Sequence, residues 1–187
     1  MRFADIPQFT RSGSWECDFD LVRLVRYIEE LEKEEGLQLN PNFQRGHVWT
    51  EEQQIAFLEY FLRGGKSGTT IYLNKPDWQR AGTVNGYNDF VCVDGLQRIT
   101  AVKRFVNNEI PVFGAYFKEY EDKSRVLPYG FKLNINDLKT ESEVLQWYID
   151  MNSGGTPHTA EEIERVKRLM EEAERKHKNG KCKYLSV

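Results

Sequence analysis

Apolar residues recur at intervals of three and four positions in five stretches of the chain, which is the spacing of amphipathic helices. The first of these faces comprises Leu21, Leu24, Val25, Ile28 and Leu31. Asp18 is a suitable N-cap for this helix, and Thr50 is one for the second, where Gln53 completes the spacing of a capping box. The pattern predicts helices over residues 18–35, 50–63, 99–107, 142–151 and 160–177.

Short apolar runs lie between these helices and predict strands over residues 37–40, 69–73, 90–93 and 110–117. The polar stretch 74–88 is expected to form an exposed loop, and residues 118–139 are mixed, with a loop around Tyr129 and Gly130. Helices and strands follow one another without a regular alternation. This order favours a compact α+β fold, with a small mixed sheet flanked by helices.

The length and composition are those of one globular unit. The chain has 187 residues, of which 40% are hydrophobic and 13% aromatic, and this is enough to build a core. We expect an N-terminal arm or an edge strand over residues 1–17, a main domain over 18–160, and a charged helix and tail over 161–187. The net charge of −3 provides no overall basic surface for nucleic acid, although a local basic groove stays open as an alternative.

The three cysteines are odd in number and form no Cys-x-x-Cys pair, so neither a zinc knuckle nor a disulfide framework is indicated. Cys92 lies within an apolar strand and is expected to be a buried thiol. The sequence has no visible leader and no apolar run long enough to span a membrane. We therefore expect a reducing, cytoplasmic setting without membrane association.

The strongest chemical signal is the turn between the third predicted strand and the third predicted helix. Gly95 permits a sharp backbone turn, and the amides after it open a helix, whose N-terminus attracts anions. Arg98 is suited to bidentate phosphate binding, Asp94 to a divalent cation or an oriented water, and Gln97 stands beside them. These residue types suit a phosphate bound with a metal. The alternative is a purely structural turn with Arg98 in an ordinary ion pair.

Two further polar loops have a composition typical of binding sites. Residues 40–49 place three amides, Arg45, a histidine and two aromatic residues between a strand and a helix. Residues 152–159 join two helices, and Gly154 and Gly155 leave backbone amides free to form an anion-binding nest. Each loop also has a structural alternative: a loop pinned by its aromatic residues in the first case, and a flexible interhelical turn in the second.

The final predicted helix is highly charged and is most simply a solvated helix with pairs such as Glu161–Arg165. It also has an apolar stripe at helical spacing, formed by Ile163, Val166, Leu169 and Met170. That stripe is a candidate surface for a protein partner or for a second copy of the chain.

In this order, the three polar segments resemble the motifs of one family, the N-terminal domain of GmrSD-type restriction proteins, a branch of the ParB/sulfiredoxin-like superfamily. The first segment is Asn42–Trp49. The second, Val93–Val102, follows the family's Asp-Gly-Gln-Gln-Arg motif except at Leu96, where Gln is usual. The third is Asn152–Thr159, in which His158 stands where an apolar residue is usual.

The resemblance spans residues 37–165 and implies a small domain that binds, and often hydrolyses, a nucleoside triphosphate (ATP, GTP or CTP) with Mg²⁺. In relatives the domain serves restriction of modified DNA, while a separate nuclease domain cuts. Carried over by position, the catalytic residues are Asp94, Gln97 and Arg98, with Asp94 also the metal ligand. The nucleotide-binding residues are Gln44, Arg45, Gly95, Thr100, Asn152, Gly154, Gly155 and Thr156.

Two functions are consistent with these residues. The first is a nucleotide-dependent phosphohydrolase or phosphotransferase linked to DNA modification, restriction or phage–host conflict, and a DNA hydroxyl as acceptor would make it a kinase. The alternative is a non-catalytic nucleotide- or DNA-binding module that acts as a switch or inhibitor of a defence complex. Nucleotide is the expected ligand, and DNA, a protein partner and a homodimer are the further candidates. The expected location is the cytoplasm of a bacterial or phage-infected cell.

Overall fold

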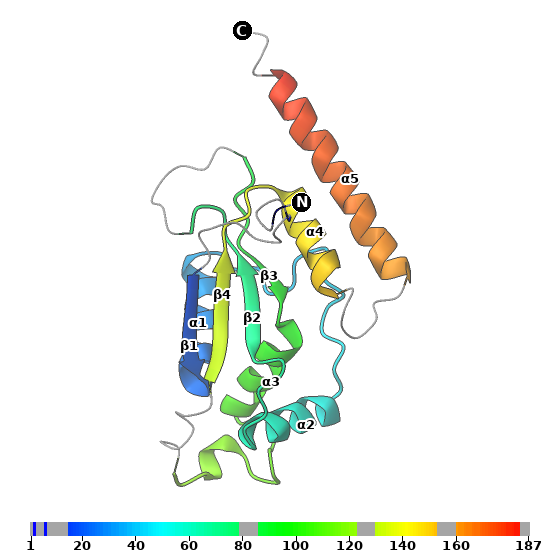
Figure 1. Ribbon diagram of the computed structural model, residues 1–187. Helices are drawn as coiled ribbons and strands as arrows, with labels where there is room; N and C mark the ends of the chain where they lie inside the picture. The colour runs from blue at the N-terminus through cyan, green and yellow to red at the C-terminus, as the bar shows by residue number, and fades with distance from the viewer. Residues whose placement is uncertain are drawn as a thin grey trace.

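The computed structural model describes residues 15–78, 86–122, 130–152 and 160–183, together with Arg2 and Ile6. For residues 160 and 177–183 only the backbone is described. These ranges contain four strands, five α-helices and one short 3₁₀ helix (Figure 1). In chain order they are β1 (Trp15–Asp20), α1 (Leu21–Glu34), α2 (Glu51–Leu62), β2 (Thr70–Asn74), β3 (Val91–Asp94), α3 (Leu96–Val106), η2 (Phe117–Glu119), β4 (Gly130–Asn136), α4 (Glu141–Asn152) and α5 (Ala160–Lys183).

The strands of the described chain form one mixed sheet in the order β1–β4–β2–β3. β4 pairs antiparallel with β1 and parallel with β2. β2 and β3 pair antiparallel, with a register shift between Tyr72 and Leu73. The expected α+β class, with a small mixed sheet flanked by helices, is therefore confirmed.

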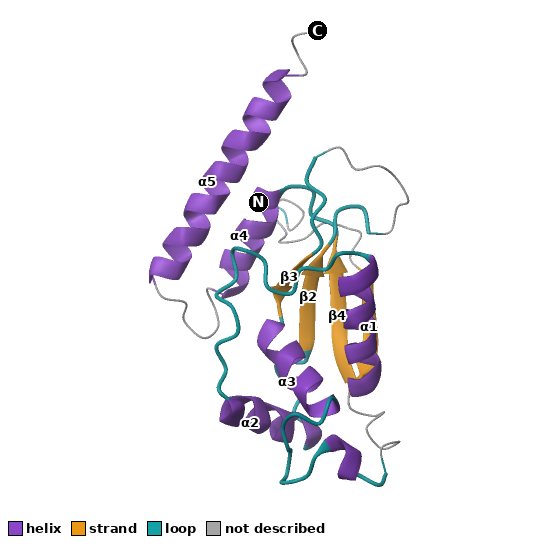
Figure 2. Cartoon of the chain, turned by 180° about the vertical axis from the view of Figure 1, so that it is seen from behind, coloured by secondary structure: helices purple, strands orange, loops and turns teal. Residues whose placement is uncertain are grey.

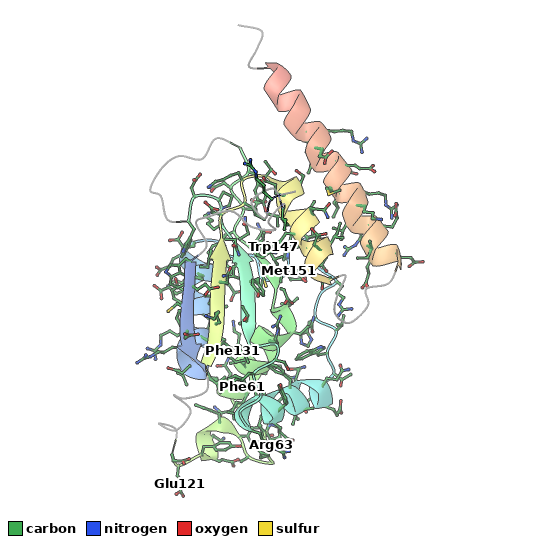
Figure 3. The ribbon with its side chains drawn as sticks, in the orientation of Figure 1. Phe61, Arg63, Glu121, Phe131, Trp147 and Met151 are labelled. Carbon is green, nitrogen blue, oxygen red and sulfur yellow. The ribbon has the colours of Figure 1, made fainter. Side chains whose placement is uncertain are left out.

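Helices bury apolar side chains against both faces of this sheet. α1, α2 and α3 pack on one face, where Phe61 and Phe131 stack with ring centroids 4.5 Å apart (Figure 3). On the other face, Trp147 of α4 meets Tyr72 of β2 edge to face, with centroids 5.8 Å apart. α5 lies beside α4 in both Figure 1 and Figure 2, and its Val166 is buried in the same cluster. Removal of these two clusters from water is the main force that holds the helices on the sheet.

The first two helices follow the sequence pattern closely. Every residue of the predicted α1 face is buried. However, the N-cap of α1 is Asp20, whose carboxylate accepts from the backbone N–H of Arg23, and the expected cap at Asp18 is wrong. Asp18 lies within β1, which pairs with β4 up to Asp20 and so delays the start of the helix. In α2, Thr50 and Gln53 form the predicted capping box.

Strand β4 lies in the stretch 118–139, which we expected to be mixed, with a loop around Tyr129 and Gly130. The expectation is wrong at Gly130, which begins the strand, and Tyr129 lies outside the described residues. Phe131, Leu133 and Ile135 alternate along the strand and are fully buried on the face covered by α1, α2 and α3. Asn134 and Asn136 alternate with them, are also buried, and bond to each other. These two asparagines give the segment a polar composition that hides its strand pattern.

Two other predicted strands are wrong as well. Residues 37–40 form only a single parallel bridge to β3. Residues 110–117 form no strand: Val112 and Ala115 bond to each other across a two-residue turn, and the turn residues between them have positive φ. This tight reversal divides the apolar run before it can extend into a strand.

Candidate functional site

Gly95 connects β3 to α3, and the geometry there explains why the residue is glycine. Its φ is +132°, a backbone conformation that residues with a side chain rarely adopt. A Cβ at this position would lie 3.0 Å from Cγ2 of Ile71 on β2. The chain therefore turns from strand to helix directly against the sheet. α3 begins with Leu96, which is buried.

Arg98 lies near the start of α3, and its guanidinium holds this turn together. Nη2 donates to Oδ2 of Asp94 at 2.5 Å, and Nη1 donates to the carbonyls of Gly68 and Thr70 at 2.8 and 2.7 Å. The Arg98 side chain is 12% exposed, whereas that of Asp94 is 40% exposed. Arg98 thus braces the turn against the start of β2, and the carboxylate is the more open member of the pair.

Gln97 fastens the 40–49 loop to α3. Its side-chain carbonyl accepts from the backbone N–H groups of Val48 and Trp49, each at 3.0 Å. Its amide nitrogen donates to the carbonyl of Gly46 at 2.8 Å. Gln97 therefore uses both ends of its amide to bring the first motif onto the second.

Gln44 makes a second attachment between the same two segments. Its amide nitrogen donates to the carbonyls of Cys92 and Val93 on β3, at 3.0 and 3.1 Å. Cys92 is the buried thiol that the sequence predicts, and burial raises its pKa to about 12. The side chain of Gln44 thus joins the 40–49 loop to the backbone of β3.

Arg45 extends from the same loop, but its surroundings differ. It is half-buried, and it makes no hydrogen bond or ion pair within the described residues. Burial raises the pKa of Tyr148 on α4 to about 12, and the nearby charges of Arg45 and Asp94 act on the same hydroxyl. The bond from Gln44 to the carbonyl of Val93 joins the residues that directly precede Arg45 and Asp94. Arg45 and Asp94, which belong to separate motifs, therefore lie in one neighbourhood near Tyr148. In Figure 1 and Figure 2 the loop between α1 and α2 runs past the end of α4, which agrees with the position of Arg45 near Tyr148.

The third motif is described only at its first residue. Asn152 ends α4, and its amide donates to the carbonyl of Tyr148 at 2.7 Å. The other predicted nucleotide-binding residues of this motif lie outside the described residues: Gly154, Gly155 and Thr156. Thr100 of α3 donates its hydroxyl to the carbonyl of Leu96 at 2.8 Å, so it is bonded within its own helix.

The chain was compared with known proteins. The sequence profile described as the GmrSD restriction endonuclease N-terminal domain matches residues 28–132, more than half of the chain. The chain belongs to this family. The part of this GmrSD-type domain that the profile matches contains the 40–49 loop and the β3–α3 turn, and it ends within β4. No curated protein and no solved structure matches the chain significantly.

Two residues beyond the matched range of this GmrSD-type domain border the site and were not expected there. Tyr148 lies on α4 and is buried there. Arg165 of α5 was expected to pair with Glu161, but its guanidinium donates to backbone carbonyls of the 40–49 loop. Neither residue has a motif signal, because each reaches the site only through the packing of α4 and α5.

The donor atoms around Asp94 limit how a metal could be held. Within the described ranges, no group of three or more His, Cys, Asp or Glu side chains could hold a metal ion. Oδ1 of Asp94 makes no hydrogen bond to a described residue. One free carboxylate oxygen does not make an all-protein metal site, but it fits Mg²⁺ that arrives with phosphate, since Mg²⁺ keeps waters and phosphate oxygens as ligands.

Among the described helices, none combines the length and the apolar composition that crossing a bilayer requires.

Proposed function

We propose that this GmrSD-type domain binds a nucleoside triphosphate with Mg²⁺ and catalyses transfer of a phosphoryl group, as part of a restriction system. The observation that carries the proposal is the state of Arg45. It is a half-buried cation without a described protein partner, in the neighbourhood that Asp94 and Tyr148 share. A guanidinium in such a place favours an anionic ligand, and its planar fork matches a phosphate.

In this proposal the motif side chains divide into a scaffold and a binding group. The scaffold side chains donate hydrogen bonds to backbone carbonyls and so hold the loop, the strand and the helix together: Gln44, Gln97 and Arg98. Arg45 is the residue that contacts phosphate, and the more exposed Asp94 is the residue that contacts the metal or the acceptor. This division suits phosphoryl transfer, which depends mainly on positioning and on neutralisation of charge.

Asp94 has a specific part in this mechanism. Its Oδ2 is fixed by Arg98, which orients the carboxylate, and Oδ1 makes no hydrogen bond to a described residue. Mg²⁺, when bound with the nucleotide, would neutralise charge on the phosphate oxygens. Asp94 would hold this ion or orient the attacking water or hydroxyl. Tyr148 is protonated at neutral pH, and burial raises its pKa further, to about 12, so its hydroxyl adds no charge near Arg45 and Asp94.

The direct test is nucleotide affinity of the purified protein with ATP, GTP and CTP in the presence of Mg²⁺, measured by titration calorimetry. Arg45→Ala is expected to weaken binding about tenfold or more, because a charge-assisted phosphate contact is lost. Arg45→Lys keeps the charge but not the planar fork, so its nucleotide affinity should lie between those of Arg45→Ala and the unaltered protein. Arg26→Ala is the matched control, since Arg26 is an exposed arginine of α1. If Arg45→Ala and Arg26→Ala bind nucleotide as the unaltered protein does, the proposed site is wrong.

A non-catalytic module is the second candidate, and one observation favours it. Three of the polar side chains that the motifs provide are bonded internally: Gln44, Gln97 and Arg98. A site that retains Arg45 and Asp94 as its open charged groups suits binding without turnover. Release of inorganic phosphate separates the two candidates. Release that is lost in Asp94→Asn, with nucleotide binding retained, supports catalysis, whereas binding without any release supports a switch.

A further inference from the structure

Arg165 makes an unusual attachment between two distant parts of the chain. Its Nη1 donates to the carbonyl of Asn42 at 2.9 Å, and its Nη2 donates to the carbonyls of Phe43 and Gln44 at 3.1 and 3.0 Å. One guanidinium therefore binds three consecutive peptide carbonyls of a loop more than a hundred residues earlier in the chain. The residue that follows these carbonyls is Arg45.

The same loop is also held from its apolar side. Phe43 is buried, and its ring meets that of Tyr148 edge to face with centroids 5.1 Å apart. Val166, the next residue along α5 after Arg165, is buried in the same cluster. The segment 42–44 thus lies between the ring contact with α4 and the guanidinium of α5. This leaves its backbone little freedom to rotate, and the direction in which Arg45 leaves the loop depends on that backbone.

We propose that Arg165 is a positioning residue, which holds the backbone of residues 42–44 so that Arg45 points at the neighbourhood of Asp94 and Tyr148. The inference rests on the proposed function, because it assigns to α5 the task of presenting the phosphate-binding arginine. A lysine could not fully replace Arg165. The flat guanidinium reaches three carbonyls in fixed directions, whereas an ammonium is a single point of charge.

The first experiment measures the loop without any nucleotide, by amide hydrogen exchange of the full chain. Arg165→Ala should speed exchange of the amides in residues 44–49, because the loop loses three charge-assisted bonds to its carbonyls. Arg168→Ala is the matched control, since Arg168 is an exposed arginine on the same helix. Unchanged exchange in folded Arg165→Ala would overturn the proposal. If that variant does not fold, Arg165→Lys is compared with Arg168→Lys in the same way.

The second experiment is a double-mutant cycle on nucleotide affinity with Mg²⁺. Arg165→Ala is expected to weaken binding about fivefold to tenfold, and Arg165→Lys less. In an Arg45→Ala background, Arg165→Ala should have little further effect, because it acts through Arg45. A residue with only a structural role would instead lower stability and leave the affinity of the folded fraction unchanged. Full additivity of the two substitutions would therefore also overturn the positioning role.

The two proposals fail in different ways. If the unaltered protein binds none of the nucleotides, the proposed function fails, and hydrogen exchange still decides whether Arg165 holds the loop. If the protein binds nucleotide and depends on Arg45, but Arg165→Ala changes neither exchange nor affinity, the proposed function stands and the positioning role is wrong.

Discussion

At the scale of single residues, the two arginines of the main motifs have opposite surroundings. Arg98 is largely buried and bonded to a carboxylate and two carbonyls, whereas Arg45 is half-buried without a described partner. An arginine whose donors are occupied by the protein stabilises the fold, and an arginine whose donors are available can bind a ligand. Their types and motif positions alone do not separate these roles.

Substitution of Arg98 should therefore act first on stability. Arg98→Ala leaves the carbonyls of Gly68 and Thr70 and the carboxylate of Asp94 without their donor. We expect a loss of about 2–4 kcal/mol in the free energy of unfolding, measured by urea denaturation. Arg26→Ala, on the exposed side of α1, should change it by less than about 0.5 kcal/mol. An Arg98→Ala protein as stable as the unaltered one would show that the bracing role is wrong.

At the scale of elements, helices with a clear apolar face could be predicted from the sequence, and β4 could not. The spacing of apolar residues is enough to predict α1, and the capping residues Thr50 and Gln53 are enough to predict the start of α2. β4 depends on a sheet that buries Asn134 and Asn136. The amide of Asn134 donates to Glu16, more than a hundred residues earlier in the chain, and the amide of Asn136 donates to Asn134. A polar residue that is buried and satisfied looks the same in sequence as one in a loop.

The candidate site shows the same limit. The 40–49 loop and the β3–α3 turn could be recognised in the sequence, because each has a characteristic spacing of residue types. Gln44 and Gln97 were among the predicted site residues. Their action on backbone groups of the other motif was not predicted, because those bonds depend on how the loop crosses β3. Tyr148 and Arg165 could not be found at all, since α4 and α5 reach the loop only through tertiary packing.

The turn between β3 and α3 allows a test with a matched pair of glycines. Gly95 and Gly36 both have positive φ, but a Cβ would meet Ile71 at Gly95 and nothing within 4 Å at Gly36. Gly36→Ala should cost about 1–2 kcal/mol, the strain of the backbone alone. Gly95→Ala should cost more, by about 1–3 kcal/mol, because its φ of +132° lies outside the left-handed α region and because the sheet must also yield. Equal losses in urea denaturation would mean that the close approach to β2 is not important.

At the scale of the whole molecule, a buried thiol and a buried tyrosine hydroxyl make the free energy of unfolding depend on pH in the alkaline range. Cys92 has a folded pKa of about 12, against an ordinary value near 9 in the unfolded chain, and burial is the main cause. Above pH 9 the unfolded chain therefore releases a proton that the folded protein keeps. Stability from this group is complete below pH 9 and falls as the pH rises toward 12. Tyr148 acts in the same direction, because burial raises its pKa as well.

Urea denaturation over this alkaline range measures the effect. The slope should reach about −1.4 kcal/mol per pH unit for each such proton. Cys92→Ala should reduce this slope, whatever it does to the stability at neutral pH. Cys17→Ala is the control, because Cys17 is a partly exposed thiol and Cys92 is a buried one. A slope that is the same in Cys92→Ala and in the unaltered protein would show that the buried thiol does not contribute.

We propose that segments far apart in the chain form one phosphate-binding site around Arg45. A crystal structure with Mg²⁺ and a non-hydrolysable nucleoside triphosphate tests this most directly. We expect phosphate oxygens at hydrogen-bond distance, about 2.7–2.9 Å, from the Arg45 guanidinium, with Arg98 still bonded to Asp94. Nucleotide bound at another place, with the Arg45 guanidinium away from every phosphate, would contradict the proposal.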